Sequence, residues 1–345
     1  MKISILLPYK ENFSPDYAGA VSLFINDTIK LSKYKKNIKV YGNTSFKKKL
    51  LPNYINLSFT KFFFRSSSKA YVKKFLEEEK KKKSNLIEIH NRPEYVNSIY
   101  KKNKNIILYF HNNPLEMKLA KTVNERINLY KKTKKIVFNS NWTLSEFMKG
   151  LHKKYKTNKL EVINQSTSKK IINFKNKKKI ILFVGRLNIS KGYDLFGEAI
   201  ISVLNNFPDW NAIVIGDEQR EKHIYKHKNL KNLGFQKNNI VTKWFIKSDI
   251  SVVCPRKSEP FGRTALEASS AGCAVIISDK GGLSEASPKA IKIKTLTVKN
   301  VENSIKKLIK NVSFKKSLQK RIYDHFYLTN NYISKKIDNN RDELI

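Results

Sequence analysis

The chain has 345 residues, of which 40% are hydrophobic and 11% aromatic, and its formal net charge at neutral pH is +41. This length is enough for two ordinary domains, and the hydrophobic content is that of a globular protein, so the charge does not indicate disorder. The two cysteines lie in or beside expected core strands, and no apolar run reaches the length of about 18 residues that a membrane span needs, so we expect a cytoplasmic protein without disulfides.

The charge comes mainly from lysine, in runs spread along the chain such as Lys80–Lys83, Lys131–Lys132 and Lys177–Lys179. No zinc-finger, helix-turn-helix or RRM pattern accompanies these runs, so a compositional bias explains them better than a nucleic-acid interface does. We therefore expect no nucleic-acid partner. A non-catalytic basic protein that binds nucleic acid is the alternative from a different functional class.

The first half of the chain alternates short apolar runs with helical stretches. The apolar runs predict strands at residues 3–7, 38–41, 86–89, 106–110, 136–138 and 160–163. The stretches between them predict helices at residues 18–31, 71–82, 116–130 and 143–148. Such alternation predicts a doubly wound, Rossmann-like α/β domain, which we place at residues 1–168.

The alternating pattern stops at a lysine-rich segment, residues 169–179, which we interpret as a linker. It restarts with predicted strands at residues 180–184, 212–215, 232–234, 250–254 and 274–277, and these indicate a second Rossmann-like domain at residues 180–312. The remaining residues, 313–345, form a helical tail. Its aromatic residues predict that it packs back across both domains.

Two cationic residues follow the first strand of the second domain. The stretch Phe183-Val184-Gly185-Arg186-Leu187-Asn188-Ile189-Ser190-Lys191-Gly192 reads as a buried strand, a glycine turn and a loop that carries Arg186 and Lys191. Ligands of open α/β folds bind at the carboxyl ends of the strands. We therefore expect Arg186 and Lys191 to neutralise a diphosphate there; two solvated loop cations are the alternative.

A strand, a charged loop and a helix follow one another between Ser248 and Ala286. The apolar run at residues 250–254 precedes a polar loop with Arg256 and Glu259, and Arg263 begins a run of good helix formers that Gly272 ends. The start of such a helix favours a bound anion, and Arg186, Arg256 and Arg263 all fall near it, where a planar, forked donor suits a phosphate.

Glu259 and Glu267, separated by seven residues in EPFGRTALEASSAG, resemble the signature of retaining, nucleotide-sugar-dependent glycosyltransferases of family four. The resemblance implies a GT-B fold, in which two Rossmann-like domains face a cleft. It also implies that Arg186, Lys191 and the backbone of Phe261, Gly262, Arg263 and Thr264 hold the donor diphosphate. In the same family Glu267 would bind the ribose hydroxyls and Glu259 the hexose.

The first domain carries weaker matches to the same family. A loop that ends Tyr17-Ala18-Gly19-Ala20-Val21 resembles the small-residue loop through which backbone approaches the donor or acceptor, although Ala20 stands where the second glycine is usual. Two strands end in His90-Asn91 and His111-Asn112. By family placement, His111 would contact the donor hexose near its reacting carbon, and His90 would lie on the acceptor side; a structural role is the alternative for each.

The implied reaction is transfer of a hexosyl or N-acetylhexosaminyl group, with retention, to a glycan or lipid-linked acceptor in lipopolysaccharide or other cell-surface polysaccharide synthesis. A covalent carboxylate intermediate and same-face attack both remain open. A UDP-sugar is the favoured donor, and no cofactor or metal is expected, because Asp-x-Asp, His-Glu-x-x-His and Cys-x-x-Cys motifs are absent. A sugar-nucleotide epimerase or a phosphorylase of the same fold is the nearest alternative.

A lipid-linked acceptor would have to be met at the membrane. Lys61-Phe62-Phe63-Phe64-Arg65 joins three aromatic residues to flanking cations, and Lys73-Lys74 and Lys80–Lys83 follow. Aromatic rings and lysines together favour an anionic lipid interface. We therefore expect peripheral association with the inner face of the membrane; a buried position for Phe62–Phe64 is the alternative.

Overall fold

The computed structural model describes residues 1–58 and 67–344, which divide into two compact units. The first unit contains residues 1–166 and the C-terminal segment from residue 330, and the second contains residues 167–329. The segment Lys61–Arg65, where membrane contact was expected, lies outside the described residues. No helix within the described ranges has the length and apolar character needed to cross a membrane.

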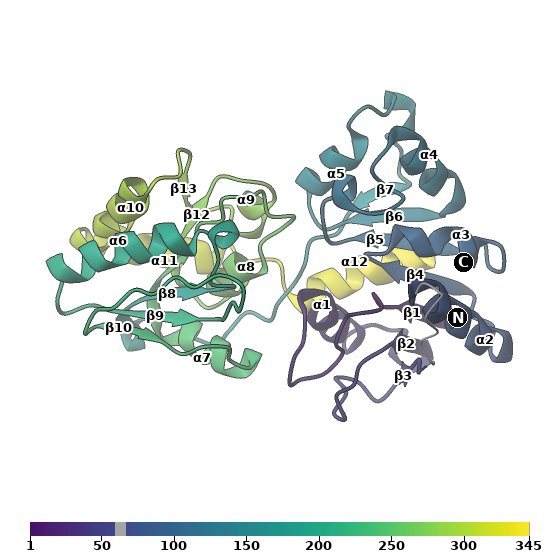
Figure 1. Ribbon diagram of the computed structural model, residues 1–345, viewed down its shortest axis with the longest axis horizontal. Helices are drawn as coiled ribbons and strands as arrows, with labels where there is room; N and C mark the ends of the chain where they lie inside the picture. The colour runs from purple at the N-terminus through teal and green to yellow at the C-terminus, as the bar shows by residue number, and fades with distance from the viewer. Residues whose placement is uncertain (59–66, 345) are drawn as a thin grey trace. The chain divides into compact units, whose positions relative to one another are not determined.

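The first unit is built on a parallel sheet of seven strands in the order β3-β2-β1-β4-β5-β6-β7. The strands are β1 (Ile3–Leu6), β2 (Ile38–Gly42), β3 (Tyr54–Asn56), β4 (Leu86–His90), β5 (Ile106–Phe110), β6 (Lys135–Phe138) and β7 (Leu160–Val162). The helices are α1 (Ala20–Ile29), α2 (Ser67–Lys81), α3 (Val96–Tyr100), α4 (Val123–Lys132), α5 (Asn141–Met148) and α12 (Asn330–Asp342) (Figure 1).

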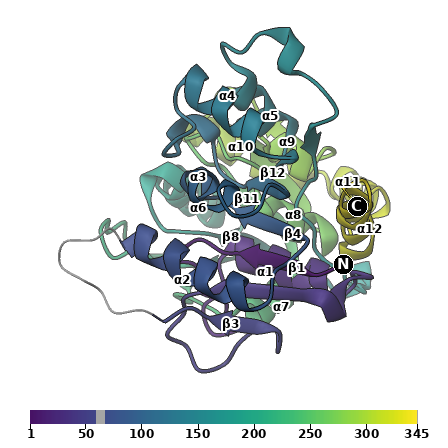
Figure 2. The ribbon, with the colours of Figure 1, turned by 90° about the vertical axis from the view of Figure 1, so that its right-hand side faces the viewer.

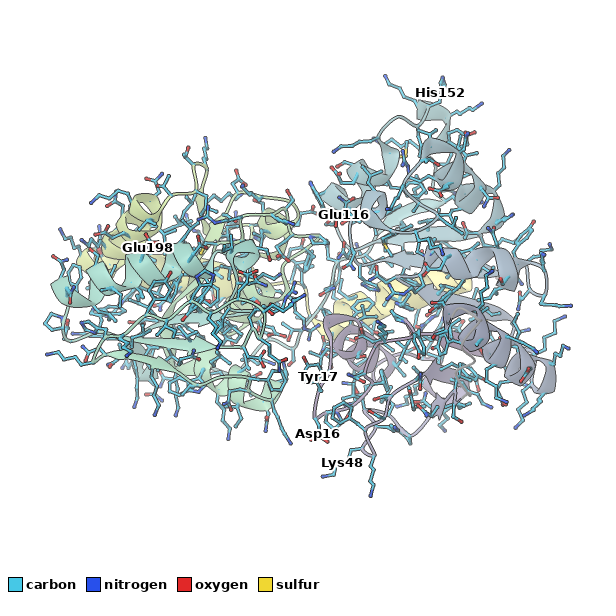
Figure 3. All side chains as sticks on the ribbon, viewed as in Figure 1. Asp16, Tyr17, Lys48, Glu116, His152 and Glu198 are labelled. Carbon is cyan, nitrogen blue, oxygen red and sulfur yellow. The ribbon has the colours of Figure 1, made fainter. Side chains whose placement is uncertain are left out.

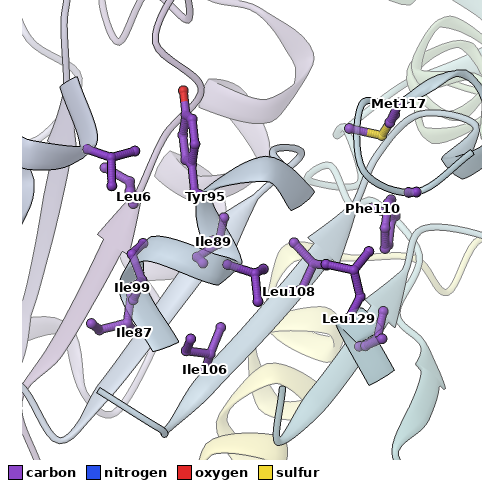
Figure 4. Packing of buried hydrophobic residues seen from close by; sticks show 14 of the residues in the cluster. Leu6, Ile87, Ile89, Tyr95, Ile99, Ile106, Leu108, Phe110, Met117 and Leu129 are labelled. Carbon is purple, nitrogen blue, oxygen red and sulfur yellow. The ribbon is translucent and has the colours of Figure 1, made fainter. Parts of the chain in front are cut away.

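The two faces of this sheet differ in character because side chains alternate along a strand. On one face Ile87, Ile89, Ile106 and Leu108 pack into an apolar cluster with residues of α2, α3, α4 and α5 (Figure 4). Figure 2 looks onto α2 and α3 where they cover this face. On the opposite face, β4 presents Glu88 and His90, and β5 presents Tyr109. A polar group buried in this way needs a partner, and α12 supplies one in Arg341.

The second unit is built on a parallel sheet of six strands in the order β10-β9-β8-β11-β12-β13. The strands are β8 (Lys178–Val184), β9 (Asn211–Ile215), β10 (Leu230–Asn232), β11 (Ser248–Val253), β12 (Ala274–Ser278) and β13 (Ile291–Ile293). The helices are α6 (Tyr193–Asn206), α7 (Asn238–Lys247), α8 (Arg263–Ser270), α9 (Leu283–Ala286), α10 (Val298–Lys310) and α11 (Val312–Asp324). The predicted architecture of two doubly wound α/β units is therefore confirmed.

The expected linker at residues 169–179 is part of the second unit instead. Lys170 donates a backbone hydrogen bond to the carbonyl of Ser270 at 2.9 Å, and Lys177 Nζ donates to the carbonyl of Ser248 at 2.8 Å. Lys177 Nζ also lies 3.3 Å from the carbonyl of Phe245, in the last turn of α7. The lysine-rich composition was misleading, because a cation at a helix C-terminus is a stabilising contact and not a sign of a solvated spacer.

The expected tail at residues 313–345 is divided between the two units. Helix α11 packs on β12 and α8 in the second unit, whereas α12 returns to the first unit and packs beside α1 (Figure 1). The predicted helix at residues 116–130 begins only at Val123, because Thr122 and Glu125 form a capping box at that point. The three-residue strands β3 and β13 were not predicted.

Candidate functional site

The charged residues expected in the second unit meet at its topological switch point. Strands β8 and β11 are hydrogen-bonded neighbours, and the chain leaves them toward opposite sides of the sheet, so the loops that follow them lie together at the carboxyl edge. Across this edge Lys191 Nζ lies 2.5 Å from Glu259 Oε1, although the two residues are 68 positions apart in sequence. The structure thus unites the two motifs into one site.

The loop after β8 is fixed by its backbone. Gly192 has φ +71°, and a Cβ at this position would lie 1.9 Å from the carbonyl oxygen of Cys254, so only glycine fits between the two loops. Asn188 Oδ1 accepts from the backbone N–H of Lys191 at 3.1 Å, and its amide donates to Glu218 Oε2 at 3.0 Å. These contacts hold Lys191 in place, while Arg186 is exposed on the same loop.

The second motif forms the start of α8. Gly262 precedes the helix with φ +109° and has no side chain to cap it, and Phe261 is buried. A helix start of this kind is a ready site for an anion. One turn into the helix, Glu267 Oε1 accepts from Arg263 Nε at 2.8 Å. The predicted strand-helix-strand unit is confirmed: β11 and β12 are paired parallel strands, and α8 lies between them in the chain.

Besides Lys191, two of the expected arginines are paired with carboxylates. Arg263 contacts Glu267, as described above, and Arg256 forms an ion pair with Asp194 on α6. Arg256 therefore braces the loop after β11 against α6. Of the three arginines that the sequence placed near an anion, Arg186 on the loop after β8 is the one that forms no ion pair with the described residues.

In the first unit, Gly19 stands directly before α1 and has an acidic neighbour. The carboxylate of Glu11 accepts from the backbone N–H of Ser22 at 3.1 Å and from its hydroxyl at 2.9 Å. A Cβ on Gly19 would lie 2.4 Å from the same carboxylate oxygen, and Ala20 is exposed beside it. Burial raises the pKa of Glu11. Glu11 thus occupies the space beside Gly19, and the expected approach of a donor or acceptor to this loop stays a prediction.

The two histidines that end β4 and β5 are in direct contact. His90 Nδ1 lies 3.0 Å from His111 Nε2, and the ring of His90 stacks on that of Tyr109 at a centroid distance of 4.3 Å. His90 is 2% exposed and His111 6% exposed. His90 thus lies in the interior against His111 and Tyr109, and its expected place on the acceptor side stays a prediction.

His111 is held by residues that the sequence did not single out. Asn91, at φ +58°, accepts through Oδ1 from the backbone N–H of His111 at 3.1 Å, and Asn139 Nδ2 donates to the carbonyl of His111 at 3.0 Å. Phe24 of α1 packs edge-on against the imidazole. The repeated His-Asn after two neighbouring strands was the available signal for Asn91, because parallel strand ends meet at one edge of a sheet.

Both imidazoles are kept neutral by their surroundings. Burial lowers the pKa of His90, and burial together with the neighbouring His90 lowers the pKa of His111 well below its usual range. Within residues 1–58 and 67–344, no group of three or more histidine, cysteine, aspartate or glutamate side chains is placed to hold a metal ion.

The sequence of the second unit matches a known family. Residues 164–325 fit the family model described as glycosyl transferases group 1. The lipopolysaccharide core biosynthesis mannosyltransferase LpsB of Rhizobium meliloti (strain 1021) is 31% identical to this chain over 133 residues, which are 35% of this chain. The match spans 37% of the length of that relative.

The likeness to solved structures extends over the whole chain. The crystal structure of Anabaena Alr3699/HepE in complex with UDP and glucose superposes with a TM-score of 0.76 at 16% identity and covers 99% of both chains. The sucrose-phosphate synthase of Thermosynechococcus elongatus has a TM-score of 0.77 at 14% identity and covers 100% of this chain and 99% of its own. The chain therefore has the GT-B fold of these solved structures, and its residues 164–325 match the family model of glycosyl transferases group 1.

Proposed function

We propose that this protein is a retaining glycosyltransferase of family four. It transfers a hexosyl or N-acetylhexosaminyl group from a nucleotide-diphosphate sugar, with a UDP-sugar favoured, to a glycan or lipid-linked acceptor. The pathway is the synthesis of lipopolysaccharide or another cell-surface polysaccharide. The enzyme works in the cytoplasm, at the inner face of the membrane, and uses no metal or other cofactor.

The observation that carries this proposal is the contact between Lys191 and Glu259 at the switch point of the second sheet. A cation and a carboxylate placed beside an uncapped helix start suit the two halves of a nucleotide-diphosphate sugar, which are an anionic leaving group and a hydroxyl-rich sugar. When a diphosphate takes Lys191 as its partner, Glu259 is released from the ion pair and becomes free to accept hydrogen bonds from the hexose.

The other candidate residues divide in the same way between the diphosphate and the sugar parts of the donor. Arg186 is exposed on the loop of Lys191 and adds a second cation for the diphosphate, and the backbone of Phe261–Thr264 completes that site. Glu267, anchored by Arg263, accepts hydrogen bonds from the ribose. In the first unit, His111 binds the donor sugar near its reacting carbon. Neutral imidazole suits this position, because a positive charge there would oppose a cation-like glycosyl centre.

The relatives support the choice of donors to test. The HepE protein was crystallised with UDP and glucose, and the name of LpsB describes a mannosyltransferase of the lipopolysaccharide core. We therefore expect activity within a set of UDP-hexoses, UDP-N-acetylhexosamines and nucleotide-activated mannose.

The test is a screen of these donors for release of nucleoside diphosphate, first with water and then with glycan and lipid-linked acceptors. Proton NMR of the product should show the anomeric configuration of the donor. An inverted product would overturn retention, and release of nucleoside monophosphate in place of diphosphate would overturn the assigned leaving group. Interconversion of the donor sugar without transfer would identify an epimerase.

A further inference from the structure

A buried chain of polar side chains connects the C-terminal helix to His111. Arg341 of α12 donates to both carboxylate oxygens of Glu88 on β4, from Nε at 2.7 Å and from Nη2 at 2.9 Å. The side chains are 4% and 1% exposed. Glu88 is followed along the sheet by His90, whose Nε2 lies 3.9 Å from Glu88 Oε2, and then by His111.

Arg341 keeps the carboxyl group of Glu88 ionised. Burial alone would raise the pKa of the carboxyl, but the charge of Arg341 outweighs burial and lowers the pKa of Glu88 to about 2. The carboxylate is therefore ionised at every pH at which the protein is expected to work. At 3.9 Å it is too far from His90 Nε2 for a normal hydrogen bond, yet its negative charge acts strongly across a dry interior.

That charge decides where the imidazole protons lie. A proton on His90 Nε2 faces the carboxylate favourably, whereas a lone pair there would be repelled by it. Since His90 is neutral, its Nδ1 then carries a lone pair and accepts from His111 Nε2–H across the 3.0 Å contact. His111 is neutral as well, so its Nδ1 carries the remaining lone pair. Among the described residues, this buried nitrogen has no hydrogen-bond partner.

We propose that Arg341, Glu88 and His90 are positioning residues for His111, which keep its proton on Nε2 and present Nδ1 as a hydrogen-bond acceptor to a hydroxyl of the donor sugar. The identity of the hydroxyl donor rests on the proposed function, whereas the position of the protons does not. Glu88 and His90 thus act on His111 from the neighbouring strand, and Arg341 of α12 holds the carboxylate of Glu88 in place.

The same arginine offers a matched control in Asp338. Arg341 Nη1 donates to Asp338 Oδ1 at 2.9 Å, and Asp338 also accepts from the hydroxyl of Ser32 at 2.7 Å and from the backbone of Lys33 at 2.8 Å. Asp338 is as buried as Glu88 to within a few per cent and pairs with the same cation, but no contact joins it to either histidine within the described chain. The loss of the Asp338 charge therefore shows the effect of a weakened network in which the imidazole protons keep their positions.

The experiment is nitrogen-15 NMR of the imidazole rings in the unliganded full-length protein at pH 7.5. The signals of the two rings are assigned by their loss in His90→Gln and His111→Gln. In the wild type, we expect protonated Nε2 and bare Nδ1 on both rings. In Glu88→Gln the amide oxygen should face Arg341 and the amide N–H₂ should face His90, so both rings should switch to protonated Nδ1. In Asp338→Asn both should keep the wild-type pattern.

A wild-type spectrum with the proton on His111 Nδ1 would overturn the proposal, and so would an unchanged pattern in Glu88→Gln or a switch in Asp338→Asn. If Glu88→Gln fails to fold, the wild-type spectrum alone decides which nitrogen of His111 carries the proton. Turnover provides a second readout: Glu88→Gln should lower kcat by roughly tenfold or more, because a donor hydroxyl would then meet an N–H. Absence of transferase activity with every donor would refute the proposed function and leave the spectra as evidence.

Discussion

At the scale of single residues, the site is defined by charges that are partly neutralised within the protein. Lys191 pairs with Glu259, and Glu267 pairs with Arg263, so neither carboxylate stands alone in the second unit. A ligand with a diphosphate and several hydroxyls can exchange these internal pairs for contacts of its own. Replacing single members of these pairs therefore shows which of them the ligand contacts.

Replacement of Lys191 by alanine should lower kcat/KM by roughly 10²-fold or more, because its proposed role is to stabilise charge that develops on the departing diphosphate. Lys179→Ala is a suitable control. Lys179 forms an ion pair of the same length, 2.5 Å, with Asp209 in the same unit, but on the exposed surface. Steady-state kinetics of the two variants and of Arg186→Ala give the comparison. Equal effects of Lys191→Ala and Lys179→Ala would contradict the assigned role.

The two carboxylates should separate binding from turnover. Glu267→Gln should chiefly weaken nucleotide binding, because one acceptor oxygen toward the ribose is exchanged for an amide. Glu259→Gln should leave nucleotide affinity near normal and lower kcat, because its proposed partner is the hexose. Calorimetric titration with UDP measures the first effect and initial rates the second. Identical behaviour of the two variants in the titration would refute the division of roles.

The buried histidines predict a loss of stability in mild acid. Because the folded-state pKa values of His90 and His111 lie below the ordinary 6.5, the unfolded chain binds more protons, and stability rises with pH through this window. The free energy of unfolding should therefore fall as the pH drops below about 6.5, by up to about 1.4 kcal/mol per pH unit for each imidazole that stays neutral.

Urea unfolding between pH 7.5 and 5.5 tests this dependence, with His90→Gln/His111→Gln as the comparison. The charged or titratable groups that face the two rings are Glu88 and Tyr109 from the sheet and Arg341 from α12. Burial raises the pKa of Tyr109 far above this window, and Glu88 titrates below it. If the double variant kept the full slope of the wild type, groups other than these imidazoles would be responsible.

At the scale of elements, the turn into α6 depends on one glycine. Gly192 combines φ +71° with a backbone carbonyl at 1.9 Å from where a Cβ would stand, whereas Gly234 has φ +64° and open space around it. Gly234→Ala should thus cost about 1–2 kcal/mol, the strain of the left-handed conformation alone. Gly192→Ala should cost more than about 3 kcal/mol, because the two loops of the site must also move apart.

Both glycines lie in the second unit, so its two tryptophans, Trp210 and Trp244, are suitable fluorescent reporters for urea unfolding. Similar losses of stability in the two alanine variants would show that the clash with the loop after β11 is unimportant. Activity adds a second measure, because displacement of the Lys191 loop should lower turnover in Gly192→Ala alone.

At the scale of the whole molecule, positive charge is the dominant surface property. Side chains with nitrogen ends project from every visible side of each unit, as Figure 3 shows, and Lys48, labelled there, is one of them. This dispersal agrees with a compositional bias. A local concentration nevertheless occurs at the end of α2, where Lys80, Lys81, Lys82 and Lys83 are all exposed.

We predict that the protein binds anionic vesicles at low salt. Replacement of all four residues Lys80–Lys83 by serine should weaken this binding. Each lysine near an anionic leaflet contributes about 1 kcal/mol, so four lost together should reduce binding strongly. The control removes four exposed lysines of the second unit, Lys222, Lys226, Lys228 and Lys231, and thus the same net charge. Co-sedimentation with vesicles measures both. Equal losses would indicate a charge effect without a preferred face, and no binding by the wild type would favour a soluble acceptor.

The fold class could be predicted from the sequence, and so could the residues of the proposed donor site. Apolar runs of four or more residues marked most of the strands, because burial on both faces of a parallel sheet leaves an uninterrupted hydrophobic signal. Arg186 and Lys191 were identified from a glycine-containing loop at a strand end, and Glu259 and Glu267 from a seven-residue spacing that resembles a family signature; both signals are local in sequence. Each of these features depends on neighbours within about ten residues.

What the tertiary structure alone decided are the contacts between distant segments. The pairing of Lys191 with Glu259 and the chain from Arg341 to His111 each join elements that are separate in sequence. No periodicity records such contacts, since a lysine or an arginine in a helix looks the same whether it faces water or a buried carboxylate. Helix α12 is the clearest case: its sequence predicted a helix that packs across both domains, but only the position of Glu88 on the sheet explains why Arg341 and Asp338 are buried.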